Sequence, residues 1–153
     1  MVTIDLPDES ATSALAARLA AVARPGDLIA LRGELGTGKT SFARAFIRAR
    51  GGDEAVPSPT FTLVQIYDLP GGAIWHFDLY RLRAPQEAWE LGIEDAFRDG
   101  ISLIEWPERL AALLPARHLC VALDSGATAG ARRATLSADG DWAERFAAIA
   151  AEA

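Results

Sequence analysis

One eight-residue segment constrains this chain more than any other feature, since residues 33–40 read GELGTGKT. The segment matches the phosphate-binding loop pattern GxxxxGK[ST], in which glycines let backbone N–H groups curl around a polyphosphate. Lys39 is the only lysine of the chain, which otherwise uses arginine as its basic side chain. Lysine offers a compact and flexible charge to β- and γ-phosphates, and the Thr40 hydroxyl can reach Mg²⁺. We therefore expect a nucleotide phosphate site here.

The residues around this loop predict a strand before it and a helix after it. Residues 28–31 form a short apolar run behind a Pro-Gly-Asp turn, which is typical of a buried parallel strand. Residues 40–50 contain no glycine or proline, and Gly-Gly follows at 51–52. One face of this predicted helix would carry Phe42, Ala43, Phe46 and Ile47. A polyphosphate would then lie at a helix N-terminus, where unpaired amides and the helix dipole favour an anion.

Length and composition indicate one domain, residues 1–153, with half of its residues hydrophobic. The net charge of −6 argues against a basic surface that grips nucleic acid unaided. The single cysteine, Cys120, excludes an intramolecular disulfide, and two histidines beside it give no zinc-site spacing. No apolar run is long enough to span a membrane, and the N-terminus lacks a signal-peptide pattern. We therefore expect a cytoplasmic protein with no membrane partner.

The order of the remaining predicted elements indicates the fold class. Strands are expected at 61–69, 73–80, 101–104, 118–123 and 132–137, with a hairpin turn at 70–72. Helices are expected from 8–10 up to Pro25, at 85–91, 93–98 and 108–114, and at 141–153. Several of these strands follow one another without a helix between them. The prediction is an α/β fold, a P-loop NTPase-like mixed sheet with a parallel core and antiparallel strands, flanked by helices.

Asp78 and Glu105 are the candidate catalytic acids. Hydrolysis or transfer of a phosphoryl group needs an acid that holds Mg²⁺ or orients water, usually at the carboxyl end of a neighbouring strand. Asp78 would share one strand face with His76 and Tyr80. Glu105 directly follows the apolar run 101–104. The alternatives are a half-solvated edge strand for Asp78 and a capping or surface carboxylate for Glu105.

Two further features bear on the nucleotide. Ser58 and Thr60 lie between the predicted helix and the next strand, where the hydroxyls of switch loops contact Mg²⁺ or a γ-phosphate. An ordinary turn explains them equally well. The chain contains no asparagine, so the guanine-binding Asn-Lys-x-Asp motif of GTPases and the catalytic asparagine of protein kinases are both excluded. Adenine is therefore favoured by elimination.

Taken together, these motifs resemble the TsaE family, the bacterial P-loop ATPases of tRNA threonylcarbamoyladenosine biosynthesis. The matching segments are GELGTGKT at 33–40, SPTFTLV at 58–64, HFDLYRL at 76–82, GI at 92–93 and EWP at 105–107. They occur in the order and with the spacing of the family. Many families share the phosphate loop, whereas HFDLYRL and EWP are much more specific.

The resemblance implies an ATPase that binds ATP and Mg²⁺ and acts with the partner proteins TsaB and TsaD. These partners transfer a threonylcarbamoyl group to adenosine 37 of tRNA, so the chain would meet tRNA only through the complex. The implied catalytic residues are Lys39, Asp78 and Glu105, and the implied Mg²⁺ ligands are Thr40 and Glu105. The implied nucleotide-binding residues are Glu9 near the adenine, Thr60 in a switch loop, and Leu35, Gly36, Thr37, Gly38, Lys39 and Thr40 around the phosphates.

Two other functions remain open from the residues. A small-molecule kinase uses the same kind of loop, but it usually carries an arginine-rich lid, and only Arg81 and Arg83 follow Tyr80. A nucleotide-dependent scaffold without useful catalysis would need neither Asp78 nor Glu105. If Asp78→Ala and Glu105→Ala both kept ATP turnover and partner-dependent activity, the scaffold would be favoured over an ATPase.

Overall fold

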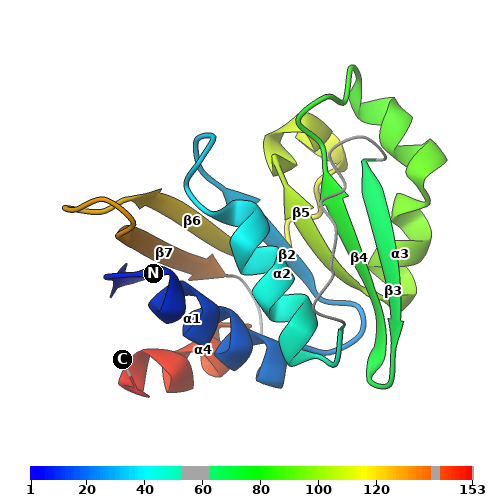
Figure 1. Ribbon diagram of the computed structural model, residues 1–153. Coiled ribbons are helices and arrows are strands. Elements are labelled where there is room, and N and C mark those ends of the chain that lie inside the picture. Colours follow the sequence, from blue (N-terminus) through cyan, green and yellow to red (C-terminus); the bar gives the residue numbers. More distant parts are fainter. Residues whose placement is uncertain (53–62, 139–141, 153) are drawn as a thin grey trace.

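The computed structural model describes residues 1–52, 63–138 and 142–152 (Figure 1). Its strands are β1 (Val2–Leu6), β2 (Leu28–Arg32), β3 (Val64–Leu69), β4 (Gly72–Asp78), β5 (Ile101–Glu105), β6 (Leu119–Ser125) and β7 (Arg132–Ala138). Its α-helices are α1 (Glu9–Val22), α2 (Lys39–Ala49), α3 (Ile93–Asp99) and α4 (Trp142–Glu152), and two 3₁₀ segments are η1 (Pro85–Leu91) and η2 (Pro107–Leu113).

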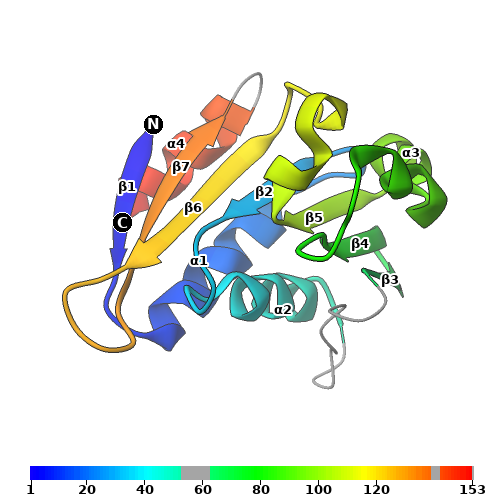
Figure 2. The same cartoon turned by 90° about the horizontal axis from the view of Figure 1, so that it is seen from above.

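The strands form one mixed sheet in the order β1-β7-β6-β2-β5-β4-β3 (Figure 2). The central pairs β6–β2, β2–β5 and β5–β4 are parallel. The outer pairs β1–β7, β7–β6 and β4–β3 are antiparallel. The predicted fold class, a parallel core with antiparallel strands and flanking helices, is therefore confirmed.

The sheet is covered on both faces, which explains the apolar runs in its central strands. Ile29 and Leu31 of β2 pack into one core together with α1, α2 and α4. Leu28 and Ala30, which point the other way along the same strand, pack into a second core with η1, α3 and η2. Figure 1 shows α1 and α2 side by side over one face of the sheet. A strand buried on both faces reads as a continuous hydrophobic run.

Most locally predicted elements are present close to their expected positions. The helix predicted at 40–50 is α2, and its four predicted apolar residues are all buried. The turn at 70–72 joins β3 to β4 as an antiparallel hairpin. The segment expected to be helical at 85–91 is a 3₁₀ helix, and α1 begins behind Asp8, whose carboxylate accepts a hydrogen bond from the Ala11 amide at 2.8 Å.

The strand predicted at 73–80 ends two residues early, at Asp78. The chain turns there because the Tyr80 amide donates to the Asp78 carboxylate at 3.2 Å. Tyr80 therefore does not share a strand face with His76 and Asp78. The first strand of the expected hairpin begins at Val64, and residues 61 and 62 lie outside the described part of the chain.

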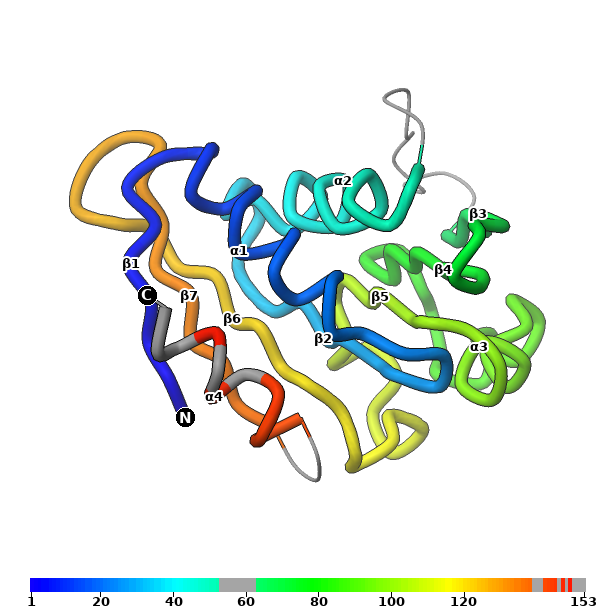
Figure 3. Tube along the Cα trace, turned by 90° about the horizontal axis from the view of Figure 1, so that it is seen from below, coloured from blue at the N-terminus to red at the C-terminus, as the bar shows by residue number. Residues whose placement is uncertain are grey.

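The N-terminal strand β1 was not predicted from the sequence. It pairs with β7 at the edge of the sheet, and Figure 3 shows α4 lying beside this edge. Its residues VTIDL alternate between apolar and polar side chains, which is the signal that would have revealed it. Within the described residues, no helix has the length and apolar character needed to cross a membrane.

Candidate functional site

The sheet topology brings the predicted phosphate loop and both candidate acids together at the carboxyl ends of the central strands. The loop follows β2, Asp78 is the last residue of β4, and Glu105 is the last residue of β5. These strands are parallel neighbours, and the register places Glu105 opposite both Leu31 and Asp78. The carboxyl ends of parallel strands are where α/β proteins bind their ligands.

Two glycines explain the shape of the loop. Gly33 has a φ of +147°, and a Cβ there would lie 2.5 Å from the carbonyl oxygen of Leu123. Gly38 caps α2 in the left-handed region, with a φ of 96° and no side-chain hydrogen bond to the first turn of the helix. A side chain at either position would strain the loop. The first-turn amides of α2 therefore face the loop without a side-chain cap, as a bound polyphosphate requires.

The Lys39 ammonium group is buried beneath this loop. It donates hydrogen bonds to the carbonyl oxygens of Gly33 and Glu34, the latter at 3.2 Å. It also lies 3.8 Å from the ring centroid of Trp106, within the range of a cation–π contact. Burial lowers the pKa of Lys39, and the nearby carboxylates, above all that of Glu105, oppose this change.

Glu105 is held at both of its carboxylate oxygens. The Thr40 hydroxyl donates to Oε1 at 2.8 Å, and the His76 ring nitrogen Nε2 lies 2.7 Å from Oε2. Glu105 and His76 are both buried, with 2% and 0% of their surface exposed. The interpretation of Glu105 as a surface carboxylate is therefore wrong. A hydroxyl and a carboxylate in contact at the end of a phosphate loop form a suitable pair of ligands for Mg²⁺.

Asp78 lies beside this pair and is also buried. Its strand β4 lies between β3 and β5, so the alternative of an edge strand is excluded. Burial raises the pKa of Asp78, and the negative charge of Glu105 raises it further. The Tyr80 amide opposes this rise by donating to the ionised form. A carboxylate with a raised pKa is a better proton acceptor than an exposed one.

The phosphate loop also receives hydrogen bonds from an arginine of strand β7, which is distant in sequence. Arg132 of β7 donates from Nε to the Thr37 carbonyl at 3.0 Å and from Nη2 to the Gly36 carbonyl at 3.0 Å. The Thr37 hydroxyl adds a bond of 2.8 Å to the Glu34 carbonyl. These bonds hold the tip of the loop from outside. The sequence left the role of Arg132 open.

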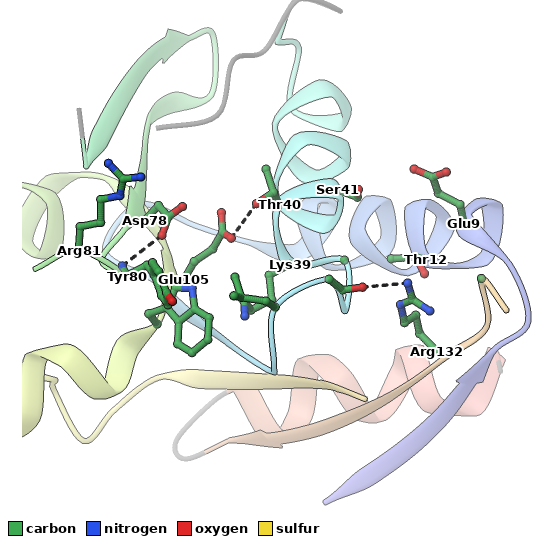
Figure 4. A pocket seen from close by; sticks show the side chains of 15 residues that line it. Glu9, Thr12, Lys39, Thr40, Ser41, Asp78, Tyr80, Arg81, Glu105 and Arg132 are labelled. Atoms are coloured by element: carbon green, nitrogen blue, oxygen red, sulfur yellow. Dashed lines mark hydrogen bonds between the residues drawn. The ribbon is translucent and has the colours of Figure 1, made fainter. Parts of the chain in front are cut away.

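These groups line one cavity of about 580 Å³, a size typical of sites for small organic ligands (Figure 4). Lys39, Thr40, Asp78 and Glu105 lie at one end of the cavity in Figure 4. Glu9, Thr12 and Arg132 lie at the other end. The phosphate and metal groups of a nucleotide would fit the first end, and its nucleoside the second.

The described residues hold no cluster of three or more His, Cys, Asp or Glu side chains that would form a metal site. Mg²⁺ is commonly held by one or two protein oxygens together with phosphate oxygens and water. The Thr40–Glu105 pair supplies such oxygens beside the phosphate loop. The chemistry of the site therefore fits Mg²⁺ bound with a nucleotide.

Sequence reasoning missed several residues of the cavity wall. Trp106 has a φ of 59° directly after Glu105, which turns the chain and brings its ring against Lys39 and, at 5.0 Å between centroids, against Tyr80. Only Glu105 was singled out in this turn for chemistry. Trp106 lines the cavity, and Trp89 is exposed over 47% of its surface.

The structure gathers nearly all the residues that the sequence singled out. Those on the cavity wall are Glu9, Leu35, Gly36, Gly38, Lys39, Thr40, Asp78 and Glu105, and Thr37 is a buried residue of the loop itself. Ser58 and Thr60 lie outside the described residues. Their switch-loop role stays a prediction.

Comparison with known proteins identifies relatives over most of the chain. The family described as "Threonylcarbamoyl adenosine biosynthesis protein TsaE" matches residues 6–134. The protein of Rickettsia bellii named tRNA threonylcarbamoyladenosine biosynthesis protein TsaE is 43% identical over 111 residues, which cover 72% of this chain and 77% of the relative. The protein of the same name from Bacillus subtilis is 36% identical over 118 residues, covering 76% and 72%.

Other relatives extend well beyond the matched stretch. The TsaE protein of Rickettsia felis is 44% identical over 110 residues, which cover 71% of this chain but only 64% of the relative. Among solved structures, the crystal structure of Bacillus subtilis YdiB superposes with a TM-score of 0.79 at 27% identity, covering 99% of this chain and 94% of YdiB. Fold and sequence therefore point to the same relatives.

Proposed function

The chain belongs to the TsaE family of threonylcarbamoyl adenosine biosynthesis proteins, and we propose that it is the ATP-binding and ATP-hydrolysing component of that machinery. The observation that carries the proposal is the Thr40–Glu105 contact beside a buried Lys39, with Asp78 at the end of the neighbouring strand. Phosphate binding, metal binding and a proton acceptor are thereby combined in one cavity.

In the proposed reaction, the loop amides and the Lys39 ammonium hold the β- and γ-phosphates of ATP. The Thr40 hydroxyl and the Glu105 carboxylate hold Mg²⁺, which when bound offsets the negative charge that develops on the phosphates. The Asp78 carboxylate orients a water molecule and accepts its proton as the water oxygen bonds to the γ-phosphorus. The bond between the γ-phosphorus and the bridging oxygen breaks, which releases ADP and phosphate.

The base of the bound nucleotide would be adenine and would lie at the end of the cavity away from Asp78 and Glu105. Glu9 and Thr12 of α1 and Arg132 of β7 line the end opposite Asp78. Family membership supports the remaining parts of the proposal. The chain would act in the cytoplasm with TsaB and TsaD, which modify adenosine 37 of tRNA, and it would contact tRNA through that complex.

The test is ATP hydrolysis by the purified chain, alone and with a purified TsaB–TsaD pair. We expect weak turnover by the chain alone, faster turnover with the pair, and loss of nucleotide binding in Lys39→Ala. The variant removes the only ammonium group at the phosphates, and its folding is checked by circular dichroism. Unchanged ATP affinity in Lys39→Ala would contradict the site assignment.

The acids distinguish the ATPase from the other functions. We expect Asp78→Ala and Glu105→Ala to abolish turnover, and if both retained full ATP turnover and partner-dependent activity, the scaffold interpretation would replace this one. Transfer of the γ-phosphoryl group to a metabolite in a substrate screen would instead indicate a kinase.

A further inference from the structure

We propose that His76 is a positioning residue for the metal-binding carboxylate: it holds Oε2 of Glu105 so that Oε1 stays on Thr40 and faces the Mg²⁺ position. The inference rests on the proposed function, because it assigns a task to a residue that touches neither the nucleotide nor the metal in that function. Three observations carry it, namely the contact, the burial and the strand register.

The contact fixes the plane of the carboxylate. The Nε2–Oε2 distance is 2.7 Å on one side, and the Thr40 hydroxyl lies 2.8 Å from Oε1 on the other. A carboxylate held at one oxygen can still rotate about its last bond, whereas one held at both oxygens cannot. Because an ionised carboxylate only accepts hydrogen bonds, His76 must donate from Nε2.

The burial of His76 argues against an incidental role. The side chain is fully buried beside an apolar core, and within the described residues its other ring nitrogen, Nδ1, has no hydrogen-bond partner. Burying a polar atom without a partner costs free energy. An apolar side chain at this position would avoid that cost, so the ring is best explained by what Nε2 does for Glu105.

The register explains why a histidine reaches Glu105 from this position. His76 lies opposite Leu103 in the parallel β4–β5 pair, while Glu105 lies opposite Asp78. His76 is therefore the diagonal neighbour of Glu105 on the same face of the sheet. Its ring spans this diagonal, whereas Asp78 lies directly opposite Glu105 and stays available for the attacking water.

Removing a residue that hydrogen-bonds to a metal ligand commonly lowers metal affinity by about 10- to 100-fold. His76→Leu removes the donor and keeps an apolar side chain of similar width. We expect His76→Leu to raise the Mg²⁺ concentration needed for half-maximal tightening of ADP or ATP binding by about tenfold or more. Nucleotide affinity measured in excess chelator should not change.

His76→Gln provides the rescue, because the glutamine amide nitrogen can replace Nε2 as donor. We expect this variant to restore most of the Mg²⁺ dependence that His76→Leu loses. The matched control is Ile74→Val, which alters the core two residues earlier on the same face of β4. It should lower the unfolding temperature and leave the Mg²⁺ midpoint unchanged.

The readout is calorimetric or fluorescent titration of nucleotide binding at a series of Mg²⁺ concentrations, with the full chain. A His76→Leu protein with the wild-type Mg²⁺ midpoint would overturn the positioning role and leave the proposed function intact. A wild-type protein whose nucleotide binding ignores Mg²⁺ would overturn both. If His76→Leu does not fold, His76→Asn, whose amide is too short to reach Glu105, is compared with His76→Gln by the same criteria.

Discussion

At the scale of single residues, Asp78 is a carboxyl group whose charge the folded protein tolerates poorly. Burial raises its pKa, and Glu105 on the neighbouring strand raises it further. The folded state therefore binds a proton to Asp78 at a pH where the unfolded chain has already released it. Between these two pKa values stability falls as the pH rises, and above both of them the full destabilising effect is present.

We therefore predict that Asp78→Asn stabilises the ligand-free protein at neutral pH while it abolishes ATP turnover. Each kcal/mol added to the free energy of unfolding would raise the unfolding temperature by about 2–4 °C for a chain of this size. The gain should shrink as the pH falls through the raised pKa, because wild-type Asp78 is then protonated. Thermal unfolding at several pH values tests this.

The matched control for Asp78→Asn is Asp124→Asn, which changes an exposed carboxyl group on β6. It should leave the unfolding temperature close to the wild-type value at every pH. A lower unfolding temperature for Asp78→Asn at neutral pH would show that the carboxylate stabilises the site and that the predicted sign is wrong.

At the scale of elements, the phosphate loop is held in place by strand β7, which is distant in sequence. Arg132 donates to the Thr37 and Gly36 carbonyls at the tip of the loop, across 95 and 96 positions of the chain. A hydrogen bond from a charged donor contributes about 1.5–3 kcal/mol to stability, which is more than a bond between neutral groups contributes. The loop geometry thus depends on the docking of β7 against β6.

We predict that Arg132→Ala weakens ADP binding by about tenfold, which corresponds to about 1.4 kcal/mol. The loop tip loses its external support, and the cavity loses a positive charge. The adjacent Arg133→Ala is the control, because Arg133 is 60% exposed and pairs with Asp5 at 3.0 Å on the surface. Titration with ADP measures both variants.

Arg132→Gln separates the two contributions, because it keeps a hydrogen-bond donor without the charge. Affinity near the wild-type value in Arg132→Gln would assign the effect to support of the loop. If Arg132→Ala binds ADP as tightly as Arg133→Ala does, the loop keeps its shape without this arginine and the prediction fails.

At the scale of the whole molecule, α4 is tied to the segment between α1 and β2, at the amino end of β2 and away from the cavity. Arg145 of α4 makes a bidentate ion pair with Asp27, with contacts of 2.6 and 3.0 Å, and also donates to the Val22 carbonyl at 2.9 Å. Its guanidinium group lies 3.8 Å from the ring centroid of Trp142. The two charged side chains are 8% and 13% exposed, so water screens them little.

We predict that Arg145→Ala lowers the free energy of unfolding by roughly 3 kcal/mol, because it leaves Asp27 without its charged partner. The value is at the low end for buried pairs, since Asp27 keeps a hydrogen bond from the Arg24 amide. Urea denaturation measures the loss, and hydrogen exchange should show earlier opening of α4. ADP affinity should be unchanged, because the cavity lies at the carboxyl end of β2, whereas Asp27 precedes its amino end.

Arg98→Ala is the control for this prediction, because Arg98 pairs with Asp95 and Asp99 on the surface, where its side chain is 66% exposed. It should change the stability little. Equal stability of the Arg98 and Arg145 variants would show that α4 is not anchored through its ion pair.

The local elements and the kind of chemistry could be predicted from the amino-acid pattern. The strand, loop and helix around GELGTGKT follow from hydrophobic runs, glycines and the position of Lys39, all of which act over a few residues. The hairpin turn at 70–72 and the start of α1 behind Asp8 have the same local origin. Glu105 was found because it directly follows an apolar run, and Asp78 because it would share a strand face with other polar side chains.

The contacts between these elements, in contrast, depend on how the whole chain folds. His76 reaches Glu105 across 29 positions and Arg132 reaches Thr37 across 95, so neither contact leaves a local pattern in the sequence. The strand β1 is stabilised by its pairing with β7, because a short edge strand has little stability of its own. Local periodicity specifies which residues form an element, whereas the register between distant strands specifies which side chains meet in the cavity.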